Sequence, residues 1–251
     1  MQDRREEILA LITAKGEASI AELSAIFPNV SSMTIRRDLE YLESRGDVVR
    51  TKGGAKSIRH LSLRREAAYQ HRESENADLK HEIAKKAAGL IDDDSCIYFD
   101  AGSTIMHIAQ NIGEKPMFAI TNDPYLALEL IKNPNCEVSM TSGKLSRRNV
   151  SLSGLGATNF LKGINIGTAL MAASGYSPDL GFTCGTYDEA MLKQAVIASA
   201  KKVIMVMDST KFSHSHPFTF AKAQDIDYFV TDSRADKAAL AHLSRAGVRL
   251  I

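Results

Sequence analysis

Hydrophobic residues in the first part of the chain recur at the spacing of short helices. They mark one helix around residues 8–12, a second around 23–27 that Ser19 is placed to cap, and a third around 35–42 that Ser31 is placed to cap. The stretch that follows, DVVRTKGGAKSI, predicts two short strands around a Gly-Gly turn. Three helices and a hairpin in about 55 residues are typical of a winged helix-turn-helix unit.

The hydrophobic pattern changes after residue 57. Residues 58–78 are strongly charged and mostly helix-forming, which indicates a solvated linker or a linking helix. From residue 79 onward, short apolar runs alternate with amphipathic helical segments, as in an α/β domain with a mostly parallel sheet. The sequence therefore predicts an α/β fold, with a winged helix-turn-helix domain at 1–57, a linker at 58–78 and a mostly parallel α/β domain at 79–251.

Composition places the chain among ordinary globular proteins. It is 44% hydrophobic and 24% charged, with a net charge of +1. No run approaches the roughly 20 apolar residues of a membrane span, and the chain opens on the charged QDRREE, so we expect a cytoplasmic protein with no membrane partner. The cysteines, Cys96, Cys136 and Cys184, fit neither a disulfide framework nor a zinc cluster, so buried reduced thiols are expected and no metal or cofactor is predicted.

The third predicted helix carries the chemistry of a DNA reader. With about 100° per residue, its apolar stripe lies opposite an outward N-terminal face made of Ser32, Met33, Thr34, Arg36 and Arg37. In helix-turn-helix proteins this part of the second helix of the motif enters the major groove, where arginine reads guanine and Ser or Thr suit phosphates. Arg50, Lys52 and Lys56 on the hairpin would contact phosphates, with Gly53 and Gly54 allowing close backbone approach.

The charge of this region supports the DNA interpretation. Residues 31–60 contain seven basic and four acidic residues, and the acidic Asp38, Glu40 and Glu43 lie mostly where the helix would leave the groove. The alternative is a helical oligomerisation module with a solvated basic face. Helical spacing alone leaves the two open. The capped third helix, the glycine hairpin and the basic excess together favour DNA.

Residues 19–55, SIAELSAIFPNVSSMTIRRDLEYLESRGDVVRTKGGA, resemble the N-terminal signature of the DeoR family of bacterial transcriptional regulators. That signature has an EL helix followed by V-S-x-x-T-I-R-R-D-L, L-x-x-x-G and G-G-A. One departure lies in the turn before the third helix, where Pro28 and Asn29 stand in place of the family's usual single residue. The resemblance implies an operator-binding protein, and the two-fold symmetry of DNA half-sites implies a homodimer or homotetramer.

Four predicted strand ends in the second domain carry polar groups that suit a phosphorylated polyol. Ligands of parallel α/β domains sit at the carboxyl ends of strands, where carboxylates accept from hydroxyls and helix starts attract anions. Taken singly, each strand end is better explained by ordinary capping and turn chemistry. Taken together they favour an effector site over ordinary capping, with these candidate residues: Asp100, Gly102, Ser103, Thr104, Thr121, Asn122, Gly143, Lys144, Asp208 and Lys211.

The D-x-G-S-T, T-N and D-S-[ST]-K elements, with GFT at 181–183, resemble the sensor domain of the same family. The resemblance implies a fold similar to sugar-phosphate isomerases and a phosphorylated sugar effector bound by the residues just given. Two departures are Gly143-Lys144, where the family commonly has Gly-Gly, and GTALMAA, where it has D-x-x-F-[IL]-G. Lys144, Arg147 or Arg148 could add charge to the pocket.

Two functions follow from these features. The first is a repressor, not an enzyme, of a sugar or polyol catabolism operon that a phosphorylated sugar releases from its operator. The alternative is a phosphosugar isomerase-like enzyme with an appended helical module, although no nucleophile–base pair is evident. His214 and His216 are interpreted as a surface loop. Asp188, Glu189 and Lys193 fit catalytic remnants less simply than a solvated helix face with an i, i+4 Glu–Lys pair.

Overall fold

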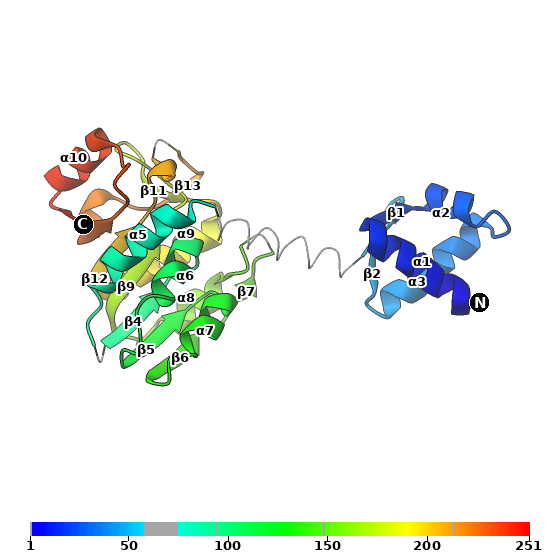
Figure 1. Cartoon of the computed structure of the whole chain (residues 1–251), viewed down its shortest axis with the longest axis horizontal. Coiled ribbons are helices and arrows are strands. Elements are labelled where there is room, and N and C mark those ends of the chain that lie inside the picture. The colour runs from blue at the N-terminus through cyan, green and yellow to red at the C-terminus, as the bar shows by residue number, and fades with distance from the viewer. Residues whose placement is uncertain (1, 58–74, 94, 148, 213) are drawn as a thin grey trace. The chain divides into compact units, whose positions relative to one another are not determined.

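The computed structural model describes residues 2–57, 75–93, 95–147, 149–212 and 214–251. The chain divides into two compact units, Met1–His71 and Arg72–Ile251, and each is described by itself (Figure 1). Most of the predicted linker, residues 58–74, lies outside the described residues, as do Arg59 and Arg148.

The N-terminal unit has the predicted helices and hairpin, together with a strand that was not predicted. Its elements are α1 (Gln2–Lys15), β1 (Glu17–Ser19), α2 (Ile20–Ile26), α3 (Ser32–Ser44), β2 (Val48–Thr51) and β3 (Gly54–Ser57). The strands form an antiparallel sheet in the order β1-β3-β2. The predicted apolar stripes are confirmed, because Ile35, Leu39 and Leu42 of α3 are fully buried against residues of α1, α2 and the sheet.

Both predicted helix caps are present. The Ser19 hydroxyl accepts from the Glu22 amide at 3.1 Å while the Glu22 carboxylate accepts from the Ser19 amide, which completes a capping box. The Ser31 hydroxyl accepts from the Thr34 amide at 3.2 Å. These caps fix where α2 and α3 begin and therefore which side chains of α3 point outward.

The turn of the hairpin lies one residue earlier than the predicted Gly-Gly turn. The turn consists of Lys52 and Gly53, whereas Gly54 belongs to β3 and pairs with Ser19 of β1. A Cβ on Gly54 would lie 2.1 Å from the Ala18 carbonyl oxygen. Gly54 therefore allows β1 to approach β3. This close contact within the protein explains the glycine without any contact to a DNA backbone.

The C-terminal unit has a parallel sheet at its centre, as predicted. The sheet has seven strands in the order β15-β14-β12-β9-β4-β5-β6, and every neighbouring pair is parallel. The strands are β4 (Ser95–Phe99), β5 (Met117–Thr121), β6 (Cys136–Met140), β9 (Ile166–Ala172), β12 (Ala200–Val206), β14 (Tyr228–Val230) and β15 (Arg249–Leu250). The helices that accompany them are α5 (Ala77–Ala88), α6 (Ser103–Ala109), α7 (Pro124–Leu130), α8 (Leu155–Phe160), α9 (Tyr187–Ser199) and α10 (Lys237–Arg245).

The direction of the chain across this sheet reverses between β4 and β9. From β4 the sheet grows through β5 to β6, and from β9 it grows the other way through β12 and β14 to β15. The connections that follow β4 and β9 therefore lead toward opposite edges of the sheet. Open α/β sheets bind ligands at the carboxyl ends of two neighbouring strands with this arrangement.

The smaller strands were not predicted as a second sheet. β10 (Gly175–Ser177), β11 (Gly181–Cys184) and β13 (Phe218–Ala221) form an antiparallel sheet, and β7 (Lys144–Leu145) pairs with β8 (Leu152–Ser153). Two 3-10 turns, η1 (Ser209–Lys211) and η2 (Ala223–Asp225), complete the described elements. Strands this short carry too few residues for an alternating pattern to show. Strands β10, β11 and β13 are held together by aromatic packing among Tyr176, Phe182 and Phe220.

Candidate DNA-binding face and effector site

The outward face of α3 carries the predicted residues. Met33 is 60% exposed, and Ser32, Arg36 and Arg37 are exposed as well. Thr34 is half-buried, and its hydroxyl shares a 3.0 Å hydrogen bond with that of Ser31. The face therefore presents two guanidinium groups and a methionine, while Thr34 is already engaged in the cap.

Ion pairing divides the basic residues of this unit into two groups. Arg36, Arg37 and Lys52 form no ion pair with any described residue, and all are exposed. The paired group consists of Arg4 and Arg5 with Asp38, Arg45 with Asp47, Arg50 with Glu40 and Glu43, and Lys56 with Glu17. Lys15, in the last turn of α1, is also exposed and has no ion pair with a described residue. The unpaired group thus contains three of the predicted DNA contacts and one further lysine, whereas Arg50 and Lys56 are held by carboxylates of the same chain.

Asp38 has a structural role that its sequence position did not indicate. Only 1% of it is exposed, and its carboxylate accepts from Arg4 Nε at 2.7 Å and Arg5 Nε at 2.8 Å. Burial opposes ionisation, but the two guanidinium hydrogen bonds outweigh it and lower the pKa of Asp38. Arg5 also lies over the ring of Tyr41, 4.0 Å from its centre. Asp38 thus fastens α1 to α3, and is not an acid placed where the helix leaves DNA.

The longer turn before α3 closes on itself. The Val30 amide donates to the Phe27 carbonyl at 3.1 Å, so Pro28 and Asn29 are the two central residues of a β-turn. Proline is favoured at the first of these positions. The extra residue is therefore taken up within the turn, and α3 still buries its apolar stripe.

Among the predicted effector-site residues, Asp100 belongs to an ion pair that the sequence did not reveal. Asp100, at the end of β4, is 1% exposed and accepts from Lys193 Nζ and from the Ala172 amide at 3.0 Å. Lys193, on α9, is 3% exposed and also donates to the Ala172 carbonyl at 2.9 Å. The interpretation of Lys193 as part of a solvated helix face was wrong. The pair links the end of β4 to α9 and to the last residue of β9.

Lys193 is positively charged within this buried site. Burial alone would lower the pKa of Lys193, but attraction to Asp100 and to Glu189, whose carboxylate lies 3.7 Å away, outweighs burial and raises it. Two carboxylates thus surround one ammonium group. A permanently protonated lysine is a hydrogen-bond donor and not a nucleophile.

Asn122 links the ends of β4 and β5 to the β7–β8 hairpin. Its side-chain oxygen accepts from the Ala101 amide at 3.0 Å, and its side-chain nitrogen donates to the Leu152 carbonyl at 3.0 Å. The Leu152 amide in turn donates to the Asn122 carbonyl at 2.7 Å. Thr121, by contrast, uses its hydroxyl to accept from the Asp123 amide at 3.1 Å, which is ordinary turn chemistry.

The loop after β6 packs against the start of α8. Gly143 has φ +126°, and a Cβ there would lie 2.5 Å from the Ser153 carbonyl oxygen, so glycine is required. Ser142 donates to the Gly156 carbonyl at 2.8 Å. Lys144 opens β7 as an exposed side chain without an ion pair to any described residue. This loop is therefore held beside the hairpin that Asn122 binds.

The start of α6 lies directly after Asp100. The Gly102 carbonyl accepts from the Met106 amide at 3.0 Å, Ser103 is half-buried and Thr104 is 8% exposed. Because α6 begins at Ser103, shortly after β4 ends at Phe99, both hydroxyl-bearing residues follow the same strand end as Asp100.

Asp208 and Lys211 belong to a different strand end. The Asp208 carboxylate accepts from the Thr210 amide at 3.0 Å, and Asp232 accepts from the Ser209 amide at 2.6 Å, so η1 is fixed by two buried carboxylates. Lys211 is half-buried. β12 is separated from β4 by β9, about 10 Å across the sheet. The structure thus groups Asp100, Asn122 and the 142–144 loop through direct contacts, with η1 two strands away.

Comparison with known proteins places the chain in a family. A model described as the DeoR C terminal sensor domain matches residues 75–233, and one described as the DeoR-like helix-turn-helix domain matches residues 4–60. This chain belongs to the DeoR family. It is therefore a DNA-binding transcriptional regulator.

Individual relatives agree with the DeoR assignment over nearly the whole chain. The HTH-type transcriptional regulator GlpR of Haloferax volcanii is 32% identical, over 99% of this chain and 96% of that protein. A putative aga operon transcriptional repressor of Escherichia coli O157:H7 is 30% identical, over 99% of this chain and 93% of that protein. Ribose 5-phosphate isomerase A of Methanocaldococcus jannaschii has a TM-score of 0.41 and 17% identity over 55% of each chain, a likeness too weak to carry an argument.

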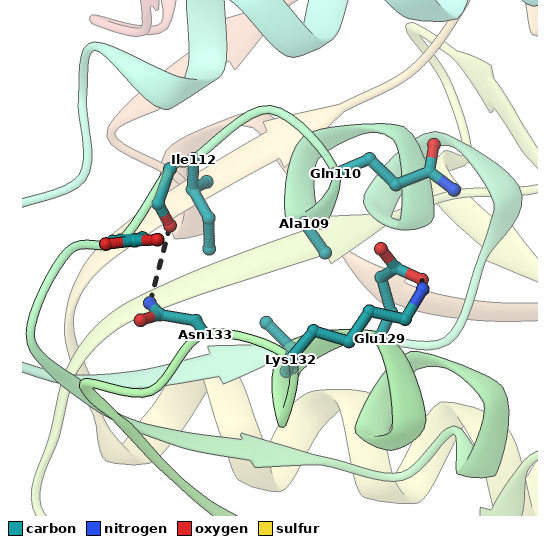
Figure 2. Close-up of a pocket in the computed structure, with 9 residues that line it drawn as sticks. Ala109, Gln110, Ile112, Glu129, Lys132 and Asn133 are labelled. Atoms are coloured by element: carbon teal, nitrogen blue, oxygen red, sulfur yellow. Dashed lines mark hydrogen bonds and ion pairs between the residues drawn. The ribbon is translucent and has the colours of Figure 1, made fainter.

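Two cavities of this DeoR-family chain lie at the amino ends of the parallel strands. One, of about 180 Å³, is lined by the ends of α6 and α7, where Lys132 pairs with Glu129 at 2.6 Å and Asn133 donates to the Gly113 carbonyl (Figure 2). The other lies at the starts of β4, β5 and β6. Because parallel sheets bind ligands at their carboxyl ends, these cavities are separate from the effector site.

The remaining side chains singled out in the sequence form no further site. Within the described ranges, no cluster of His, Cys, Asp and Glu could hold a metal ion. Cys184 is buried, whereas Cys96 and Cys136 are half-buried, and all are unpaired thiols. Burial and the nearby Glu189 carboxylate raise the pKa of Cys184 to about 12, so its thiol is unreactive at neutral pH. Among the described helices, none has the length and apolar character needed to span a bilayer.

Proposed function

We propose that this DeoR-family regulator represses an operon for sugar or polyol catabolism, and that a phosphorylated sugar releases it from its operator. The observation that carries the proposal is the buried Asp100–Lys193 pair at the switch point of the parallel sheet. A relative's name, the aga operon transcriptional repressor, supports repression as the direction of control.

The charges at this pair suggest how the effector lies. Asp100, Glu189 and Lys193 together carry a net negative charge, which disfavours a phosphate dianion beside them and favours the hydroxyls of a sugar. The Asp100 carboxylate would accept from those hydroxyls and Lys193 would donate. We assign the phosphate to Lys211, which lies two strands away from this pair, and the Ser103 and Thr104 hydroxyls to the sugar.

The regulator is not an enzyme in this proposal. Lys193 is held protonated between two carboxylates, so it is a hydrogen-bond donor and not an amine nucleophile. Isomerisation instead needs a base that moves a proton between adjacent carbons, so a turnover assay separates the two functions. The alternative of a phosphosugar isomerase predicts turnover of pentose or hexose phosphates. Incubating the full chain with each sugar phosphate and measuring isomer formation tests this, and steady product formation would refute a purely regulatory role.

Release from DNA follows from linkage between the two sites. An effector weakens operator binding only if it binds better to the conformation with low DNA affinity. A homodimer or homotetramer is part of the proposal, because a two-fold symmetric operator presents equal half-sites to equal subunits.

A thermal-shift screen of the full chain against a panel of sugar phosphates tests the effector class. A ligand that binds only the folded protein raises Tm, and the rise grows with the logarithm of the ligand concentration above Kd. The matched control is the same sugar without its phosphate. Stabilisation by one phosphorylated sugar, and release of a duplex by that sugar in a gel shift, is the expected result.

If no phosphorylated sugar shifts Tm, or if the free sugar shifts it equally, the phosphate assignment is wrong. An effector that shifts Tm but leaves the DNA complex intact would contradict release as the mode of control.

A further inference from the structure

The wing of the DNA-binding unit is tied to the recognition helix by one arginine. Arg50 of β2 pairs through Nε with the Glu43 carboxylate at 3.0 Å and through its terminal nitrogen with the Glu40 carboxylate. The Arg50 amide also donates to Glu43 at 3.0 Å. Glu43 therefore binds both the backbone and the side chain of one residue, which fixes the start of the hairpin against the C-terminal half of α3.

These contacts conflict with a phosphate-binding role for Arg50. A basic residue strengthens DNA binding largely because its approach to a phosphate releases condensed counterions. The counter-charges of Arg50 are carboxylates of its own chain. If Arg50 moved to a phosphate, the carboxylates of Glu40 and Glu43 would lose this ion pair while they lie beside the DNA. Lys52, at the tip of the hairpin, has no ion pair with a described residue and faces no such cost.

The helix geometry shows why those carboxylates matter. With about 100° per residue, Arg36, Glu40 and Glu43 lie within a stripe about 60° wide along one flank of α3. Without Arg50, two negative charges would follow Arg36 along the same flank and repel a phosphate backbone. With Arg50 in place, one of these two negative charges is cancelled.

We propose that Arg50 is a positioning residue: it holds the β2–β3 hairpin at a set orientation to α3 and offsets part of the negative charge at the acidic end of the recognition helix, and it makes no phosphate contact. The contacts of Arg50 with Glu40 and Glu43 carry this proposal, which is independent of the effector. Exposed ion pairs of this kind contribute little to the stability of a fold. We therefore expect the loss of Arg50 to change DNA affinity more than the free energy of unfolding.

The two roles predict opposite effects of removing Glu43. If Arg50 positions the wing, Glu43→Gln frees the hairpin and weakens specific binding. If Arg50 contacts phosphate, Glu43→Gln removes a competing carboxylate and strengthens binding. The probe is a duplex selected by the wild-type full chain from a random-sequence library, with a scrambled duplex as the non-specific reference.

Affinities for both duplexes are measured by fluorescence anisotropy over a range of salt concentrations, for Arg50→Gln, Glu43→Gln, the double variant and the control Lys52→Gln. We expect both single variants to lower specific affinity about tenfold and the double variant to cost little more than either, because they remove one interaction. The slope of log K against log salt should fall by about 0.9 for Lys52→Gln and stay unchanged for Arg50→Gln.

Tighter binding by Glu43→Gln, or a slope reduced by about 0.9 in Arg50→Gln, would overturn the proposal. An equal loss on the scrambled duplex would do so as well, because a wing set at the wrong orientation should lower the specific affinity more than the non-specific one. Circular dichroism melting of each variant shows whether it is folded at the assay temperature. If Arg50→Gln is unfolded there, the direction of the Glu43→Gln effect decides by itself.

Discussion

Arg36 and Arg37 differ from the other described arginines of the DNA-binding unit in having no carboxylate partner among the described residues. Arg45, on the same helix segment, pairs with Asp47 at 3.1 Å. An arginine whose charge is not satisfied within the protein is free to form two hydrogen bonds to guanine. The two classes of arginine therefore offer a test of recognition within one helix.

Arg37→Ala should cost about 1–3 kcal/mol of specific DNA binding, because it removes a base-reading side chain. Arg45→Ala removes the same charge from a paired position and is the matched control. Gel-shift titration of both variants with the selected duplex at fixed salt measures the difference. Equal losses in the two variants would mean that the effect is one of net charge and not of base contact.

Lys193 allows a second test at the scale of residues. It lies with Asp100 in the interior of the sensor unit, and both side chains are at least 96% buried. Lys193→Met should destabilise the sensor unit by about 3–5 kcal/mol, because it leaves the Asp100 carboxylate buried without a positively charged partner. Urea unfolding of the full chain gives the free energy.

The control for Lys193→Met is the double variant that also carries Asp100→Asn. It removes both charges and should recover most of the lost stability. A Lys193→Met protein as stable as wild type would mean that the pair is solvated in solution.

At the scale of elements, α1 and α3 are joined by a buried carboxylate as well as by apolar packing. Asp38 lies in the same turn of α3 as the outward Arg36 and Arg37, but points to Arg4 and Arg5 of α1. The orientation of the recognition helix thus depends on an ion pair whose members are more than thirty residues apart.

Asp38→Asn should lower the stability of the N-terminal unit by about 2 kcal/mol, between the values for surface and buried pairs. The pKa of Asp38 in the folded state lies below its ordinary value of 3.8, so its contribution is complete above that pH. The contribution is lost as the pH falls through the folded-state pKa. Hydrogen exchange of α1 and α3 amides follows the change.

Asp47→Asn, which breaks an exposed pair, serves as the control for Asp38→Asn and should change exchange much less. The difference between wild type and Asp38→Asn should be constant from about pH 5 to pH 7 and shrink below about pH 4. A difference that grows on acidification would contradict the sign of the pKa shift.

At the scale of the whole molecule, DNA binding and effector sensing occupy separate compact units. In the proposed function, a change at the carboxyl edge of the parallel sheet must alter the affinity of the other unit for DNA. Such coupling is a free energy shared by two sites, and it can be removed without damage to either unit.

Lys211→Ala should leave operator affinity unchanged and abolish release by the effector, because it removes a charge assigned to the phosphate. Lys201→Ala, which removes an exposed lysine at the start of β12, is the control and should behave as wild type. Gel shifts with the selected duplex across a range of effector concentrations measure both properties. If Lys211→Ala still releases DNA at the wild-type effector concentration, the assignment fails.

The sequence by itself determined the local elements and the family. The caps at Ser19 and Ser31 and the buried stripe of α3 are properties of neighbouring residues, so periodicity and capping chemistry predicted them. The strand-end motifs around Asp100 and Asn122 were also visible in the sequence, because successive parallel strands end at one edge of their sheet.

Only the tertiary structure decided which charges meet. Lys193 and Asp100 are 93 residues apart, and nothing in the helical pattern of α9 shows that a strand end lies over it. The same holds for Asp38 with the arginines of α1, and for Arg50 with the glutamates of α3. Periodicity tells which face of an element a side chain occupies, whereas the partner on that face depends on how distant segments pack.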